Sequence, residues 1–282
     1  MPIPWDFSHC NSVIRLAKGT HICARFAQLY VVSNVNHIQG SCFAGMDATN
    51  PGLYAQRMTE PLLKCAILPV TPYQQNCSLV WCTRTRRAAF VDPGGEVARL
   101  KQAAAAEGLT VEKVLLTHGH LDHASGAARL ARDYGVPIEG PHTDDLFLLE
   151  ALGLNKVRPG FGDAEDCRPT RWLDDGDTVT VGEAVLGVRH CPGHTPGHVV
   201  FFHRETRLAF VGDVLFRGAI GRWDFPRGNF AQLVGAITQK LWPLGDDMRF
   251  VPGHGPMSTF GWERKTNPFV GDLALKSGVS PV

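Results

Sequence analysis

The chain has 282 residues, of which 44% are hydrophobic and 20% charged, a composition typical of ordinary globular proteins. Its 28 Lys and Arg against 27 Asp and Glu give a net charge of +1, which argues against a nucleic-acid or anionic-membrane partner, and no apolar run is long enough to span a bilayer. Eight cysteines in a chain of this length do not indicate a disulfide framework. The twelve histidines stand out, because several lie within a few residues of one another.

The first 57 residues differ from the rest of the chain. They hold two acidic and four basic residues, whereas organised strand and helix patterns begin near Met58. Three interpretations compete: an organellar transit peptide, a genuine extension packed on the domain, and upstream sequence translated from a misplaced start. We favour the last, and we predict that residues 1–57 are a poorly ordered or non-native extension and residues 58–282 a single domain.

Short strands and helices alternate from Cys65 onward, with turn residues between them. Strands are predicted over Cys65–Val70, Cys77–Thr83, Ala88–Asp92, Val111–Thr117 and Val136–Ile138. Helices are predicted over Glu96–Glu107, Ala124–Tyr134 and His142–Leu152. The Gly-, Pro- and Asp-rich stretch Gly153–Thr170 is expected to be a surface loop.

The second half of the chain repeats this order. Two hairpins are predicted from Asp177–Val181 with Ala184–Arg189 and from Val199–His203 with Arg207–Val211, followed by a helix over Asn229–Trp242 and a strand over Met248–Val251. Because each half runs strands first and then strand–helix units, we predict the α+β class, with two mixed sheets packed face to face and helices outside, an αββα sandwich.

The segment Thr117–His123 is the most informative part of the sequence. His118, His120, Asp122 and His123 follow directly after a predicted strand. A strand would alternate these side chains between its faces, whereas a loop leaving the strand can converge them on one point. Imidazole and carboxylate are ligands that suit zinc or another divalent first-row metal.

Three more donors follow later predicted strands, each among glycines: His194, Asp213 and His254. Seven nitrogen and oxygen donors without a thiolate exceed the need of one tetrahedral ion. They suit two ions about 3.5–4 Å apart that share a bridging carboxylate and a hydroxide. Such a site lowers the pKa of water toward about 7 and polarises a carbonyl or phosphoryl oxygen, which predicts a hydrolase.

These motifs resemble the metallo-β-lactamase fold superfamily, and within it the glyoxalase II type, in particular short single-domain bacterial hydroxyacylglutathione hydrolases. The resemblance runs from about Cys65 to Phe269 and includes Val91–Gly95, Gly221–Gly228 and Asn267–Phe269. It implies two divalent ions, zinc first with iron or manganese as alternatives. The ligands that it implies are His118, His120 and His194 for one ion, Asp122, His123 and His254 for the other, and Asp213 as the bridge.

The resemblance also implies an enzyme of methylglyoxal detoxification. We expect it in the cytoplasm, or in an organelle if residues 1–57 are a transit peptide. Its substrate would be a small-molecule thioester, S-D-lactoylglutathione or a related hydroxyacyl-glutathione, hydrolysed by a metal-bridged hydroxide. A thiol with a pKa near 8.5 leaves as thiolate without a general acid, so no further catalytic pair is required. We expect Asp122 to act as a catalytic residue as well as a ligand, by steering the proton of the hydroxide.

One departure from the family concerns the substrate site. Too few residues follow His254 for the C-terminal helical domain that supplies much of the glutathione site in full-length glyoxalase II enzymes. Arg222 is the candidate for binding a substrate carboxylate, and a structural ion pair is the competing interpretation. Thr195 and His198 are expected to orient ligands rather than to bind metal.

Two other reaction classes compete with thioester hydrolysis. Persulfide dioxygenases share the His-x-His-x-Asp-His motif and use one iron on residues equivalent to His118, His194 and Asp213. Lactone or lactam hydrolysis is the third alternative. A non-enzymatic role is disfavoured because the ligand set is complete.

Overall fold

Two β-sheets form the centre of the computed structural model, which describes residues 60–278, so the predicted extension over residues 1–57 lies outside them. The first sheet has the order β1-β2-β3-β4-β5, with β1 (Leu63–Val70), β2 (Gln75–Cys82), β3 (Arg87–Val91), β4 (Thr110–Leu115) and β5 (Ile138–Glu139). The second has the order β13-β12-β9-β8-β7-β6, with β6 (Thr178–Val181), β7 (Ala184–His190), β8 (Val199–His203), β9 (Leu208–Gly212), β12 (Arg249–Pro252) and β13 (Ser258–Thr259). A separate hairpin joins β10 (Leu215–Phe216) and β11 (Ala219–Ile220).

The two sheets face each other across an apolar layer, because their strands alternate side chains between two buried faces. In β2, Val80 faces the second sheet, whereas Leu79 and Trp81 face the helices outside. In β7, Leu186 points into the layer between the sheets, and Val185 points outward and is 52% exposed. Both sheets combine parallel and antiparallel pairs.

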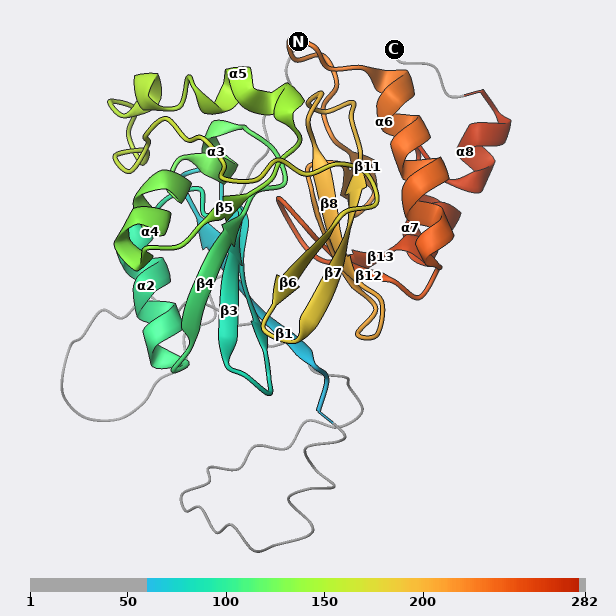
Figure 1. Cartoon of the computed structure of the whole chain (residues 1–282). Coiled ribbons are helices and arrows are strands. Elements are labelled where there is room, and N and C mark those ends of the chain that lie inside the picture. The colour runs from blue at the N-terminus through green and yellow to red at the C-terminus, as the bar shows by residue number, and fades with distance from the viewer. Residues whose placement is uncertain (1–59, 279–282) are drawn as a thin grey trace, which may run out of the picture.

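Helices cover the outer faces of both sheets (Figure 1). The helices α2 (Val97–Ala106) and α4 (Ala127–Tyr134) pack on the first sheet through side chains such as Leu100 and Leu130. The second sheet is covered by α6 (Phe230–Ala236) and α7 (Phe260–Thr266), and α8 (Asp272–Lys276) follows. This arrangement confirms the predicted αββα sandwich with mixed sheets. Within residues 60–278, no helix combines the length and the hydropathy needed to cross a bilayer.

Several predicted helices differ from the observed ones. The stretch predicted as one helix over Ala124–Tyr134 is divided between α3 (Leu121–Ala124) and α4. The helix predicted over His142–Leu152 is a 3-10 turn, η1 (Thr143–Asp145), followed by the short α5 (Leu146–Leu149) and another 3-10 turn, η2 (Gly153–Asn155). After Ala236, α6 widens into a π-helical segment, η3 (Ile237–Leu241), and ends in a 3-10 turn, η4 (Trp242–Leu244). The Thr238 hydroxyl donates to the carbonyl of Val234 in this region, a bond that distorts helices.

Candidate metal centre

The side chains predicted to bind metal follow strands that run in the same direction. β3 is parallel to β4 and β9 to β12, while β7 and β9 are both antiparallel to β8, so the carboxyl ends of these strands reach one edge of the sandwich. The predicted ligands lie after those ends: His118, His120, Asp122 and His123 after β4, His194 after β7, Asp213 after β9 and His254 after β12. Two backbone hydrogen bonds of 2.7 Å join the sheets here, from Val199 to Thr117 and from Asn76 to Gly253.

Three histidines form the first group of donors, which we name the three-His cluster: His118, His120 and His194. Nε2 of His118 lies 3.1 Å from Nδ1 of His120, and the same Nδ1 lies 2.9 Å from Nε2 of His194. Ligands at about 2.0–2.1 Å from a tetrahedral zinc ion lie about 3.4 Å from one another. The three nitrogens are therefore spaced close to what one such ion requires.

Asp122, His123 and His254 form the second group, which we name the Asp–His–His cluster. Oδ2 of Asp122 lies 3.0 Å from Nε2 of His254 and 3.8 Å from Nε2 of His123. Asp213 lies between the two clusters: its Oδ2 is 3.5 Å from Nε2 of His194, and its Oδ1 is 3.3 Å from Nε2 of His123. Oδ2 of Asp213 also lies 3.7 Å from Nε2 of His254. The carboxylate of Asp213 thus faces donors of both clusters, which is the placement that a bridging carboxylate needs.

Backbone carbonyls set the protonation of two of these rings. Nδ1 of His194 donates to the carbonyl of Arg222 at 2.7 Å, and Nδ1 of His254 donates to the carbonyl of Tyr73 at 3.1 Å. A carbonyl oxygen only accepts, so each ring carries a proton on Nδ1, and in the neutral form of the ring the lone pair lies on Nε2. In both rings Nε2 is the atom that faces its cluster.

Asp92, directly after β3, orients two further ligands. Its Oδ2 lies 3.0 Å from Nδ1 of His123 and accepts from the hydroxyl of Thr117 at 2.6 Å. Because that hydroxyl gives its proton to Asp92, its oxygen accepts from Nδ1 of His118, 3.0 Å away. Partners of this kind fix the tautomer of a ligating histidine and increase its basicity. Asp92 itself has a φ of 53°, a left-handed conformation that is strained for a residue other than glycine.

Burial and carboxylates divide the histidines by charge. Burial lowers the pKa of His120 to about 3 and also lowers the pKa of the other two rings of the three-His cluster, so this cluster is neutral at pH 7. Burial also opposes the charged form of His123, but Asp213 and Asp122 raise its pKa well above the usual value. Burial opposes the charged form of His254 as well, but the hydrogen bond with Asp122 and the charge of Asp213 outweigh it and raise the pKa of this ring.

Two buried atoms at the centre have no hydrogen-bond partner among residues 60–278: Nε2 of His123 and Oδ1 of Asp213. Each such atom left unsatisfied costs on the order of 1–3 kcal/mol. A divalent cation between them would satisfy both, and a set of imidazole and carboxylate donors suits zinc, iron or manganese. The residues of the two clusters therefore fit two divalent ions.

A cavity of about 520 Å³ opens beside the two clusters, a volume that suits a small-molecule ligand. Five of the donors line it: His120, Asp122, His194, Asp213 and His254. The remaining lining consists of Tyr73, Leu121, Arg158, Phe216, Arg222 and Phe225. The ring of Phe225 packs edge-on against His120 and His194, at centroid distances of 4.9 and 5.5 Å, and so covers their apolar surface.

Arg222 has features of both roles that the sequence leaves open, a substrate-binding residue and a member of a structural ion pair. It lines the cavity, and its side chain is 62% exposed. It also forms a two-pronged ion pair with Asp224, in which one N–O distance is 3.1 Å, and its guanidinium lies 4.4 Å from the centroid of the Phe225 ring. Its charge is therefore shared with a neighbouring carboxylate at the mouth of the cavity.

Thr195 and His198 lie behind the ligands and do not face the clusters. Nε2 of His198 accepts from the backbone N–H of Asp213 at 3.0 Å, and its ring stacks on that of His118 at 4.6 Å. The hydroxyl of Thr195 donates to Asp145 at 2.8 Å. Both side chains contact the ligand-bearing segments from outside.

Three residues of the centre are not among the predicted site residues. The turn Asp92-Pro93-Gly94 directly after a buried strand is a signal by which Asp92 could be found. Asp145 has no local signal, because its partners Gly119 and Thr195 are 26 and 50 positions away. Tyr73 contributes a backbone carbonyl, which any residue at this position offers.

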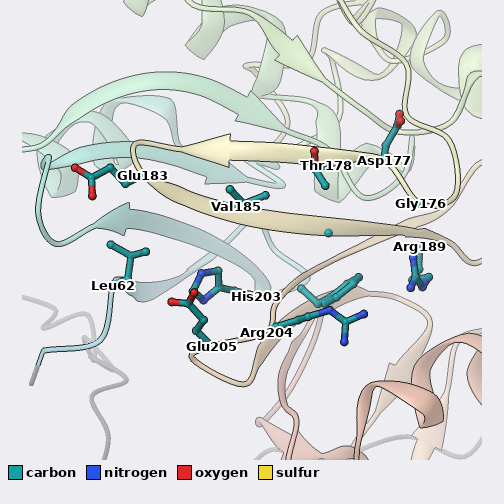
Figure 2. Close-up of a pocket in the computed structure, with 12 residues that line it drawn as sticks. Leu62, Gly176, Asp177, Thr178, Glu183, Val185, Arg189, His203, Arg204 and Glu205 are labelled. Atoms are coloured by element: carbon teal, nitrogen blue, oxygen red, sulfur yellow. The ribbon is translucent and has the colours of Figure 1, made fainter.

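A second hollow, of about 420 Å³, lies on the outer face of the second sheet, over β6, β7 and β8 (Figure 2). Arg189 and Arg204 both place their guanidinium groups 5.2 Å from the centroid of the Phe202 ring there. Its lining contains no residue of either metal cluster. We therefore place the chemistry in the cavity at the strand ends.

Comparisons with known proteins identify the family of this chain. The family model of the metallo-β-lactamase superfamily matches residues 70–254. The hydroxyacylglutathione hydrolase GloC of Haemophilus influenzae is 44% identical over 205 residues, which cover 72% of this chain and 96% of that protein.

Two solved structures share the fold at similar coverage. The structure of the B3 metallo-β-lactamase BLEG-1 is 31% identical, with a TM-score of 0.66, and the match covers 72% of this chain and 98% of that one. The structure of TTHA1623 in a di-iron-bound form is 36% identical, with a TM-score of 0.63, and the match covers 72% and 99%. The predicted family, fold and enzyme class, a metallo-hydrolase, are thereby confirmed. The chain belongs to the metallo-β-lactamase superfamily.

Proposed function

We propose that this protein hydrolyses thioesters, and that its substrate is S-D-lactoylglutathione or a related hydroxyacyl-glutathione. The observation that carries the proposal is Asp213, placed between the three-His cluster and the Asp–His–His cluster beside a cavity of small-molecule size. The name of the relative from Haemophilus influenzae supports the hydroxyacyl-glutathione class.

In this proposal each cluster would hold one divalent ion, and Asp213 would contribute its carboxylate to both. Zinc is the first candidate, and the di-iron form of TTHA1623 supports iron as an alternative, with manganese as a third. When bound, such a pair of ions lowers the pKa of water toward about 7 and polarises the carbonyl of the substrate.

Asp122 is the residue that we assign to proton handling, because it lines the cavity and also belongs to the Asp–His–His cluster. Burial opposes its ionisation, but the charge of His123 and the hydrogen bond with His254 lower its pKa, so it is a carboxylate at neutral pH and can hold a proton released from water. The leaving thiol has a pKa near 8.5 and departs as thiolate, so no residue needs to protonate it.

Two arginines at the cavity suit the carboxylates of a glutathione conjugate, since a guanidinium binds a carboxylate with two parallel hydrogen bonds. Arg222 is already paired with Asp224. Arg158 has no carboxylate partner among residues 60–278, and it donates instead to the hydroxyl of Tyr73 at 3.3 Å. We therefore assign Arg158 as the more available cation and Arg222 as the second.

We place the protein in the cytoplasm. Cys65, Cys77, Cys82, Cys167 and Cys191 are all buried free thiols, and free thiols are the normal state of cysteine in a reducing compartment. A glutathione-derived substrate belongs to the same kind of compartment.

The test is a thioesterase assay on metal-quantified protein. S-D-lactoylglutathione is offered, and the loss of thioester absorbance is followed while the metal content is varied up to two ions per chain. We expect turnover to rise with metal content. An acyl thioester without carboxylates is the matched control, and we expect a higher KM for it because it cannot pair with Arg158 and Arg222.

Other outcomes identify the competing functions. No thioester loss, together with one iron per chain and persulfide-dependent oxygen uptake, would identify a mononuclear iron persulfide dioxygenase. Opening of a lactone or lactam ring without thioester loss would identify the third alternative. No measurable activity in any of the three assays, with both ions bound, would contradict an enzymatic role.

A further inference from the structure

A buried carboxylate lies between the two loops that carry the three-His cluster. Asp145, at the end of the 3-10 turn η1, is 0% exposed, although it is not one of the donors. One loop holds His118 and His120 after β4, and the other holds His194 between β7 and β8. These loops come from different sheets, so something other than strand pairing must fix their separation.

Asp145 accepts three hydrogen bonds, and they come from both loops. Its Oδ2 accepts from the backbone N–H of Gly119 at 2.9 Å and from the hydroxyl of Thr195 at 2.8 Å. Its Oδ1 accepts from the backbone N–H of Gly197 at 2.6 Å. Gly119 stands between two of the histidines, Thr195 directly follows the third, and Gly197 lies three positions after it, so each bond acts within three residues of a proposed ligand.

The segment around Asp145 also contacts both loops too closely for a larger residue. A Cβ atom at Gly197 would lie 2.6 Å from the backbone nitrogen of Asp145, and one at Gly119 would lie 2.8 Å from Cβ of Leu148. Contacts under 3.0 Å are not tolerated between such atoms. The backbone N–H of His142 adds a further bond to the carbonyl of Gly197, at 3.0 Å. Both loops are therefore held against one turn of the chain.

We propose that Asp145 is a positioning residue that fixes the His118–His120 loop and the His194 loop relative to each other, and thereby determines the affinity of the three-His cluster for its metal ion. The proposal rests on the metal centre of the proposed function, and it does not depend on the substrate. The carboxylate is suited to this task because it accepts at both oxygens, whereas an amide accepts at only one.

The test compares the full-length chain with Asp145→Asn in a His254→Ala background, in which the three-His cluster keeps all its side chains and the Asp–His–His cluster does not. Metal-free protein is titrated with Co²⁺, and the visible absorption of the bound ion reports both affinity and coordination geometry. Asp145→Asn keeps only one accepting oxygen, so it loses either the bond from Gly197 or the bonds from Gly119 and Thr195. We therefore expect Co²⁺ affinity to fall by about 10- to 100-fold, the usual range for partners that orient metal ligands. The absorption bands are expected to shift as well.

Two matched variants sharpen the test. Asp144→Asn changes the neighbouring exposed carboxylate, which faces His142 and forms a separate group of donors with His142 and His190. It should leave the affinity and spectrum of the Co²⁺ ion at the three-His cluster unchanged. Thr195→Val removes one of the three bonds and should give a smaller loss in the same direction. Thermal unfolding of each metal-free variant is recorded in parallel, because a purely structural role would lower the Tm without changing the Co²⁺ spectrum of the folded protein.

Three results would overturn the proposal. The first is an Asp145→Asn protein that binds Co²⁺ with the affinity and spectrum of its parent. The second is an equal loss in Asp144→Asn. The third is a parent that binds no Co²⁺, which would overturn the metal centre at the same time. A wild-type protein that binds Co²⁺ normally but hydrolyses no thioester would contradict the proposed function alone.

Discussion

The two metal clusters lie side by side and share Asp213, yet they differ in charge. The three-His cluster consists only of imidazoles whose pKa values are lowered by burial, so its lone pairs are free at neutral pH. The Asp–His–His cluster includes Asp122, and its carboxylate environment raises the pKa values of His123 and His254. The first cluster is thus preorganised for an ion, whereas protons compete with the ion at the second. The difference teaches that the placement of a few carboxylates can give two adjacent sites a different dependence on pH.

The largest effect is expected from Asp213→Ala, because it removes a carboxylate that faces both clusters. Turnover should fall by more than about 100-fold. A 100-fold loss of activity is the upper end of the range for changing a residue that only orients a metal ligand. The metal content should fall below two ions per chain. Both are measured on one preparation, by steady-state kinetics and elemental analysis. A variant that keeps two ions and full turnover would contradict the role of Asp213 as a residue shared by the two clusters, since the clusters would then be independent.

A smaller, selective effect is expected from removing one ligand at a time. His254→Ala should empty the Asp–His–His cluster and leave one ion of unchanged affinity at the three-His cluster. His120→Ala should weaken the three-His cluster instead. Calorimetric titration of each variant with Zn²⁺ counts the ions and gives their affinities. Loss of both ions in His254→Ala would show that the three-His cluster is not preorganised.

The smallest expected effect is in proton release. The pKa values of His123 and His254 are raised above 6.5, so at pH 6.5 both rings are mainly in the doubly protonated, positively charged form in the metal-free protein. A ligating histidine must be neutral, so filling this cluster should release about two protons, and filling the three-His cluster almost none. Affinity at the Asp–His–His cluster should therefore rise with pH until these raised pKa values are passed.

Titrations in two buffers of different ionisation enthalpy measure this release. Equal proton release for the first and the second ion would contradict the charge difference between the clusters. Metal added to His254→Ala provides the reference, since only the neutral cluster is complete in that protein.

The sequence predicts this molecule best where the information is local. The donors of Thr117–His123 lie within one turn of chain after a buried strand, and the structure places all four of them at the strand ends. Strands of two residues, such as β10, β11 and β13, are too short to give a hydrophobic period. The role of Asp145 depends on partners from two distant loops, and nothing in its neighbourhood indicates it.

The common edge where the two sheets meet has a consequence for how the enzyme matures. Four of the donors follow β4 in the first sheet, and three follow strands of the second sheet, so neither part of the chain carries a complete set. During synthesis the centre cannot close until β12 and His254 have emerged. An ion bound by both sheets then acts as a cross-link, and at a free concentration of 1,000 times its Kd it adds about 4 kcal/mol to the free energy of unfolding. Metal supply would thus govern the lifetime of the folded protein as well as its activity.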